Sequence, residues 1–179
     1  RNLPFTLFMG GDDGAYNRNG IAAKWRVALA QLRMDDPGGY DHRVTIYEGK
    51  GHWMDGEDRE ALPWMARRTR KAWPSRVVWL QDDVVHERYY WLQVKRANAK
   101  AGQRVEATVQ GQTIAIVTDP RAAHPVKELT LHLLDRLVDL DRPLTVTWNG
   151  TVVHEGKVER TRGSVERSFA SSLSREQCG

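Results

Sequence analysis

The sequence YEGKGHWMDG, residues 47–56, carries one histidine on a glycine-rich stretch. A segment of strand-forming residues precedes this stretch, and a segment suited to the start of a helix follows it. Residues 42–47, which lead into it, are rich in strand-forming side chains. Asp55 and Glu57 follow the histidine, where the N-terminus of a helix favours negative charge. The pattern therefore predicts that His52 lies on a loop from a strand to a helix, the position at which α/β folds commonly place functional groups.

A second segment of the same kind lies upstream. Residues 3–10 are mostly apolar and run into Gly10 and Gly11, after which the chain presents Asp12 and Asp13. A helix is predicted to follow because apolar residues recur at helical spacing. These residues are Ile21, Ala22, Trp25, Ala28, Leu29 and Leu32. The predicted order is strand, acid, helix, strand, histidine, helix.

This order resembles the C-terminal part of an α/β-hydrolase, of the group that includes esterases, dienelactone hydrolases and prolyl-oligopeptidase-like enzymes. The resemblance covers about the first 72 residues. It implies that Asp13 is the acid of a catalytic triad and His52 its general base, with Asp12 as the alternative acid. In a triad the neutral imidazole takes a proton from the nucleophile, and the carboxylate fixes the tautomer and stabilises the imidazolium.

The resemblance also implies a substrate-binding role for residues beside the two loops. These are Tyr16 and Arg18, just beyond the acid, and Trp53, next to the histidine. Packing and salt bridging are the alternative roles for Tyr16 and Arg18, and packing in the core is the alternative for Trp53.

The nucleophile of such a triad is a serine in the motif Gly-x-Ser-x-Gly, which precedes the acid in the chain. The sequence contains no such motif: Gly163-Ser164 lacks the second glycine and follows the histidine. Cys178, the only cysteine, is interpreted as a surface thiol. The chain begins almost inside a strand, so we expect a missing upstream segment, or a second copy of the chain, to cover this part. We expect the 179 residues alone to be inactive.

The pattern changes after residue 74 from helical spacing to alternation, which predicts a domain boundary there. Several short alternating segments follow, and Asn149-Gly150 is typical of a tight hairpin turn. Residues 75–179 are therefore predicted to form an all-β, immunoglobulin-like antiparallel sandwich, with a short tail or helix from Ser164. The fold class predicted for residues 1–74 is partial α/β-hydrolase, with parallel strands and flanking helices.

The composition of the chain limits the kinds of partner that it is expected to bind. The 27 basic and 23 acidic residues are spread evenly along the chain, which argues against a nucleic-acid-binding face. No apolar stretch is long enough to span a membrane. No metal or other cofactor is expected, because the histidines of the second part lack the spacing of metal ligands. These are His86, His124, His132 and His154. One cysteine leaves the cellular location open.

Two functions from different classes remain. The leading one is acyl transfer to water by a serine-type hydrolase that acts on an ester or a peptide, to which this chain contributes Asp13 and His52. The alternative is a non-catalytic module on a degenerate hydrolase scaffold that binds carbohydrate or protein. Tyr89 and Trp91 are the residues that would stack on a sugar ring, although packing in the core is the favoured interpretation for both.

Overall fold

The computed structural model describes residues 1–160 and Gly163. Ser164, the predicted helix that follows it, and Cys178 lie outside the described residues. The chain divides into two compact units, Arg1–Lys71 and Ala72–Gly179. Within the described part, no helix is both long and apolar enough to cross a membrane.

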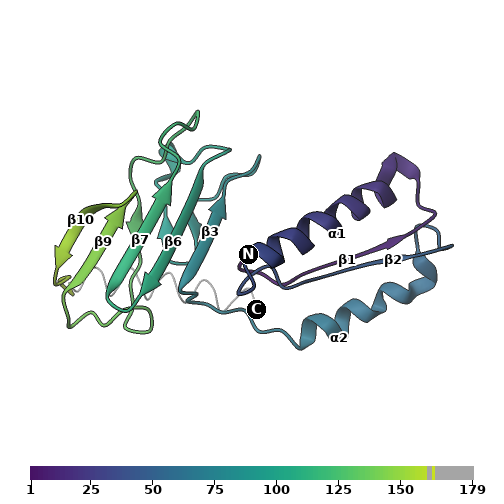
Figure 1. The fold of residues 1–179 in the computed structure, drawn as a ribbon, viewed down its shortest axis with the longest axis horizontal. Helices are drawn as coiled ribbons and strands as arrows, with labels where there is room; N and C mark the ends of the chain where they lie inside the picture. Colours follow the sequence, from purple (N-terminus) through teal and green to yellow (C-terminus); the bar gives the residue numbers. More distant parts are fainter. Residues whose placement is uncertain (161–162, 164–179) are drawn as a thin grey trace. The chain divides into compact units, whose positions relative to one another are not determined.

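The first unit is built on two parallel strands (Figure 1). β1 (Phe5–Gly10) pairs with β2 (His42–Tyr47) in a register that sets Gly10 opposite Tyr47. The connection between them contains η1 (Ala15–Asn17) and α1 (Arg18–Asp35), and η2 (Met54–Glu60) and α2 (Ala61–Ala66) follow β2. Because the strands are parallel, both of their carboxyl ends, and the loops that leave them, lie at one edge.

Little apolar surface is buried within the first unit. Its buried hydrophobic side chains are Ala22, Leu29 and Trp64. Three apolar positions of the predicted helical pattern, Ile21, Trp25 and Leu32, are exposed in this unit. In α2, Leu62 and Met65 are exposed as well. Helical periodicity correctly predicts α1, but it does not predict how much of the apolar face another element covers.

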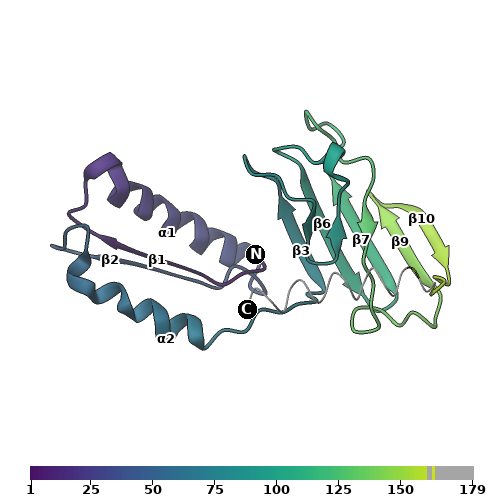
Figure 2. The ribbon, with the colours of Figure 1, turned by 180° about the vertical axis from the view of Figure 1, so that it is seen from behind.

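The second unit carries most of the described strands (Figure 2). It also contains the main hydrophobic core. One sheet has the order β10-β9-β7-β6-β3, and a smaller sheet has the order β4-β5-β8. The larger sheet consists of β3 (Arg76–Leu80), β6 (Arg104–Gln110), β7 (Thr113–Thr118), β9 (Leu144–Trp148) and β10 (Thr151–Gly156). The smaller consists of β4 (Arg88–Tyr89), β5 (Leu92–Gln93) and β8 (Thr130–Leu131), with η3 (Arg96–Asn98) after β5.

Two local features of the second unit follow from single residues. The predicted hairpin is present between β9 and β10, where Asn149 and Gly150 both have positive φ, 47° and 84°. Residues 88–93 form two short strands, β4 and β5, rather than one, because Tyr90 between them has a positive φ of 55° and the chain reverses there.

The fold class predicted from the sequence is wrong. In the described residues, parallel pairing in the first unit stops at two strands. Most of the chain's strands lie instead in the mixed and antiparallel sheets of the second unit. A helix-flanked parallel sheet of the α/β-hydrolase kind is therefore not what these residues form. Alternating sequence predicted strands in the second part, but strand partners depend on contacts that a local pattern does not contain.

The antiparallel sandwich expected for the second part is also corrected, because β7 and β9 pair in parallel, with Ile114 opposite Val146. Parallel neighbours require a crossover of a dozen or more residues. Residues 119–143 supply that crossover, and β8 within it pairs with β5 of the smaller sheet. The crossover contains no helix, so its sequence carries no signal of a parallel connection.

The core of the second unit allows a test of this architecture. We expect Leu144→Ala to lower the free energy of unfolding of this unit by about 2–5 kcal/mol, because Leu144 is buried in its hydrophobic core and loss of the side chain leaves a cavity. Val117→Ala, on the solvent side of β7, is the control and should change it by less than about 0.5 kcal/mol. Denaturant titration measures both, and equal effects would contradict the assignment of the core.

Candidate functional site

The loops that leave β1 and β2 are joined through their backbones. The amide of Gly11 donates to the carbonyl of Tyr47 (2.8 Å), and the amide of Asp12 donates to the carbonyl of Lys50 (3.0 Å). A Cβ atom at Gly10 would lie 2.5 Å from the Lys50 carbonyl oxygen and would also overlap the carbonyl of Gly51. The loops therefore approach this closely only because position 10 has no side chain.

The start of α1 holds the acid-bearing loop. Asn19 donates from its side-chain amide to the carbonyl of Gly11 (2.8 Å). Its backbone amide donates to the carbonyl of Asp13 (3.2 Å), and the amide of Asp13 donates to the carbonyl of Gly10 (3.2 Å). These bonds fix a tight turn that buries Asp13 and leaves Asp12 exposed.

The structure brings Asp13 and His52 together. Oδ2 of Asp13 lies 2.7 Å from Nδ1 of His52, within hydrogen-bonding distance. Because a carboxylate only accepts, Nδ1 carries the proton and Nε2 of the neutral ring is an acceptor. The His52 side chain is 51% exposed, and its Nε2 has no partner among the described residues. A buried carboxylate thus orients an imidazole whose other nitrogen is free to take a proton.

The environment keeps Asp13 ionised. The hydrogen bond from His52 lowers the pKa of Asp13, and the positive charge of Arg18 lowers it further, against the opposing effect of desolvation. Asp13 is therefore a carboxylate at neutral pH, as a residue that stabilises an imidazolium has to be.

Arg18 completes the central cluster. Its Nη1 atom forms an ion pair with Oδ1 of Asp13 (3.4 Å), so the salt-bridging alternative for Arg18 is present in the structure. The same atom lies 3.3 Å from Nδ1 of His52. The proton on Nδ1 points at Asp13, so the contact between Arg18 and His52 shares no proton. The guanidinium carbon lies 5.2 Å from the centre of the Tyr16 ring, a cation–π geometry.

The two aromatic residues predicted at the site lie at its periphery. Tyr16 is 87% exposed and Trp53 is 81% exposed. The Trp53 ring meets the ring of His52 edge to face, with the centroids 5.0 Å apart. Both are thus available to a ligand, and the core-packing alternative for Trp53 is wrong.

Three residues that shape the site were not singled out as such in the sequence. Gly10 and Asn19 set the approach and the turn, and Lys50 braces the histidine loop by pairing with Asp55 (2.6 Å) and Glu57 (3.4 Å). These two carboxylates raise the pKa of Lys50. The glycine pair at positions 10–11 was the available signal for a close backbone approach, whereas the role of Asn19 depends on a turn that only the structure defines.

The first unit contains no residue suited to be the nucleophile of a serine- or cysteine-type enzyme, because residues 1–71 include neither serine nor cysteine. Among the described residues there is also no group of three or more His, Cys, Asp or Glu side chains that could hold a metal ion. The chemistry that the cluster itself offers is proton transfer.

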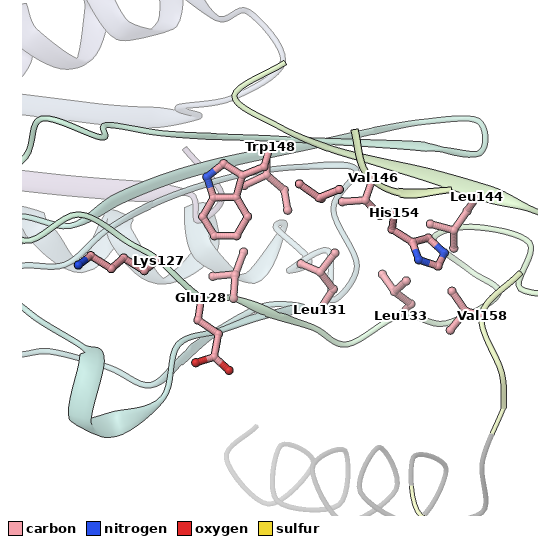
Figure 3. A pocket seen from close by; sticks show the side chains of 12 residues that line it. Lys127, Glu128, Leu131, Leu133, Leu144, Val146, Trp148, His154 and Val158 are labelled. Carbon is pink, nitrogen blue, oxygen red and sulfur yellow. The ribbon is translucent and has the colours of Figure 1, made fainter. Parts of the chain in front are cut away.

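A separate feature lies in the second unit. An open apolar groove of about 410 Å³ runs between β9, β10 and the crossover segment (Figure 3). Its lining includes Leu131, Val146, Trp148 and His154. The Trp148 indole N–H already donates to the hydroxyl of Thr118 (2.9 Å), so the indole presents only its apolar surface.

The sugar-stacking platform considered for the second unit is not available. Trp91 is fully buried, and its indole N–H donates to the carbonyl of Pro74 (2.9 Å). Tyr89 is partly buried and packs against the same core. Core packing, the favoured interpretation of both residues, is what the structure has.

Gly10→Ala should separate the two loops, because the added methyl group overlaps backbone oxygens that cannot rotate away. We expect the Nδ1 proton resonance of His52, shifted downfield by the bond to Asp13, to disappear or move upfield in the NMR spectrum. Gly14→Ala is the matched control, since a Cβ there meets nothing within 4 Å. An unchanged resonance in the Gly10 variant would contradict this account of the site.

Stability should depend on pH through Asp13. Its pKa is lowered in the folded state, so its stabilising contribution is present above the unfolded pKa of about 4 and is lost as the pH falls through the lower folded value. We expect the difference in unfolding free energy between the wild type and Asp13→Asn to shrink as the pH falls below about 4, where the Asp13 carboxylate takes up a proton. A difference that does not vary with pH would show that the carboxylate charge is not what the site uses.

Comparison with known proteins gives no family for this chain: no family model, no curated protein and no solved structure matches it. The resemblance to α/β-hydrolases accordingly stays a prediction. The feature of this chain that bears on function is the arrangement of Asp13, His52 and Arg18.

Proposed function

We propose that this chain contributes the acid and the general base of a serine-type hydrolase that cleaves an ester or a peptide bond. Asp13 orients His52 and stabilises its protonated form, and Nε2 of His52 takes the proton of the nucleophile. The observation that carries the proposal is the 2.7 Å contact between buried Asp13 and exposed His52.

The pair suits this role better than a structural one. A histidine that only stabilises a fold is normally buried with both nitrogens bonded, whereas His52 contributes little packing and leaves Nε2 open. The carboxylate is the buried member, so water cannot compete for its bond to the imidazole.

The nucleophile comes from outside the first unit, in this proposal from a segment or second polypeptide that packs beside the two loops. The exposed aromatic side chains on these loops, Tyr16 and Trp53, provide a surface for it. Without a positioned nucleophile and oxyanion donors the pair offers no covalent route, so we expect the isolated 179-residue chain not to turn over p-nitrophenyl esters.

The test uses the polypeptide or complex that contains this chain in its native source. We expect a fluorophosphonate probe to label a serine there, and His52→Ala to reduce labelling at least 100-fold, because triad residues act as a unit. His124→Ala, at an exposed position in the second unit, is the control and should leave labelling unchanged. Labelling that is absent, or that does not depend on His52, would contradict the proposal.

A second candidate function is protein binding through the groove of the second unit. The apolar lining favours aliphatic or aromatic side chains of a protein partner over carbohydrate, since a sugar requires polar partners that the groove walls scarcely offer.

The accessibility of the groove can be tested with the dye 1-anilinonaphthalene-8-sulfonate. We expect the folded chain to enhance its fluorescence, and Val153→Glu to reduce the enhancement by about half or more, because Val153 lines the groove. Val117→Glu, at an equally exposed valine of the same sheet that is not among the lining residues, is the control. Equal loss in both variants would contradict binding in the groove.

A further inference from the structure

We propose that Arg18 forms an anion-binding subsite beside the Asp13–His52 pair. It would select substrates that carry a carboxylate close to the bond that is cleaved. The anion-binding part stands on the geometry of this chain alone, whereas the statement about substrates rests on the proposed hydrolase function.

Arg18 has N–H donors without a hydrogen-bond partner among the described residues. A guanidinium has five N–H groups in a planar fork. The polar contacts of Arg18 among the described residues involve only Nη1, so Nε and Nη2 have no partner there. The side chain is 38% exposed, which leaves these donors accessible to a ligand.

His52, rather than Arg18, is the closer hydrogen-bond partner of Asp13. The bond from His52 is 2.7 Å long, while the contact from Arg18 is 3.4 Å, near the outer limit of a hydrogen bond. The contact of Arg18 with His52 shares no proton. The guanidinium of Arg18 therefore lies at the centre of the site without a short hydrogen bond. A planar carboxylate ligand could accept two hydrogen bonds from it.

Proton transfer to His52 changes the net charge of the cluster formed by Asp13, His52 and Arg18. With neutral His52, the charges of Asp13 and Arg18 cancel. When His52 takes a proton, the cluster gains a positive charge beside a guanidinium that repels it. An anion bound to Arg18 restores neutrality, so the same ligand group that is recognised also favours the protonated base.

Neighbouring groups leave the edge of the Arg18 guanidinium accessible. Tyr16 supports one face of the guanidinium and leaves its edge exposed. The other cation of the two loops, Lys50, is already paired with Asp55 and Glu57. Arg18 is therefore the cation to which an incoming carboxylate can bind.

The binding test compares benzoate with benzamide, which have similar shape but differ in charge, by NMR titration of the 179-residue chain. We expect benzoate to shift the His52 ring and Arg18 Nε–H resonances saturably, and benzamide not to do so. Arg18→Met should weaken benzoate binding about tenfold or more, and Arg18→Lys should retain part of it. Arg26→Met, at an exposed arginine of α1, should bind like the wild type.

The Nδ1 proton resonance of His52 reports in each variant whether the pair with Asp13 is intact, so that loss of binding is separated from loss of folding. Equal responses to benzoate and benzamide would overturn the subsite. So would benzoate binding by Arg18→Met as tight as that of the wild type.

The substrate statement is tested on the native assembly with mono-p-nitrophenyl glutarate and p-nitrophenyl butyrate. We expect Arg18→Met to lower kcat/KM for the glutarate monoester at least tenfold more than for the butyrate ester. Benzoate binding without either ester hydrolysis or fluorophosphonate labelling would support the anion subsite and contradict the hydrolase. Hydrolysis without a charge preference would support the hydrolase and contradict the subsite.

Discussion

The candidate site depends on one close approach, that of the Gly10 backbone to the loop at residues 50–51. Parallel pairing sets Gly10 opposite Tyr47, so both loops start at the same edge. Backbone hydrogen bonds then tie the loops together, and any side chain at position 10 would push them apart. Asp13 and His52 can form a direct bond only because this backbone contact brings their short connecting segments within reach. The relative position of the two side chains is therefore set by main-chain geometry.

The part of the site that could be predicted from sequence is the part that local rules determine. A strand that runs into glycines and then presents a polar residue occurs twice, and two such strands in parallel bring those polar residues to one edge. The choice between Asp12 and Asp13 could not be derived in this way. It depends on the turn in which the amide of Asp13 donates to the carbonyl of Gly10, which directs one carboxylate inward and the other to solvent.

The fold was less predictable, because strand partners are chosen by contacts between distant residues. Alternating residues indicate that 113–118 and 144–148 are strands, but nothing in either segment indicates that they pair in parallel. The same limit applies to burial. Trp25 stands at a regular helical position in α1, yet only two α1 residues are buried, since burial depends on which elements are present to cover a face. Local patterns thus predicted elements and loops, and failed for sheet order and for the fold class.

Backbone strain is present in both of the loops that carry the Asp13–His52 pair. Each contains two adjacent non-glycine residues with positive φ, Tyr16 and Asn17 in one and Met54 and Asp55 in the other. Asparagine and aspartate tolerate this region, but Tyr16 and Met54 do so at a cost of about 1–3 kcal/mol each. Packing does not offset that cost for Tyr16, whose ring stands in solvent. Its conformation instead places an aromatic face beneath the guanidinium of Arg18, so the strained residue supports the cation that adjoins the Asp13–His52 pair.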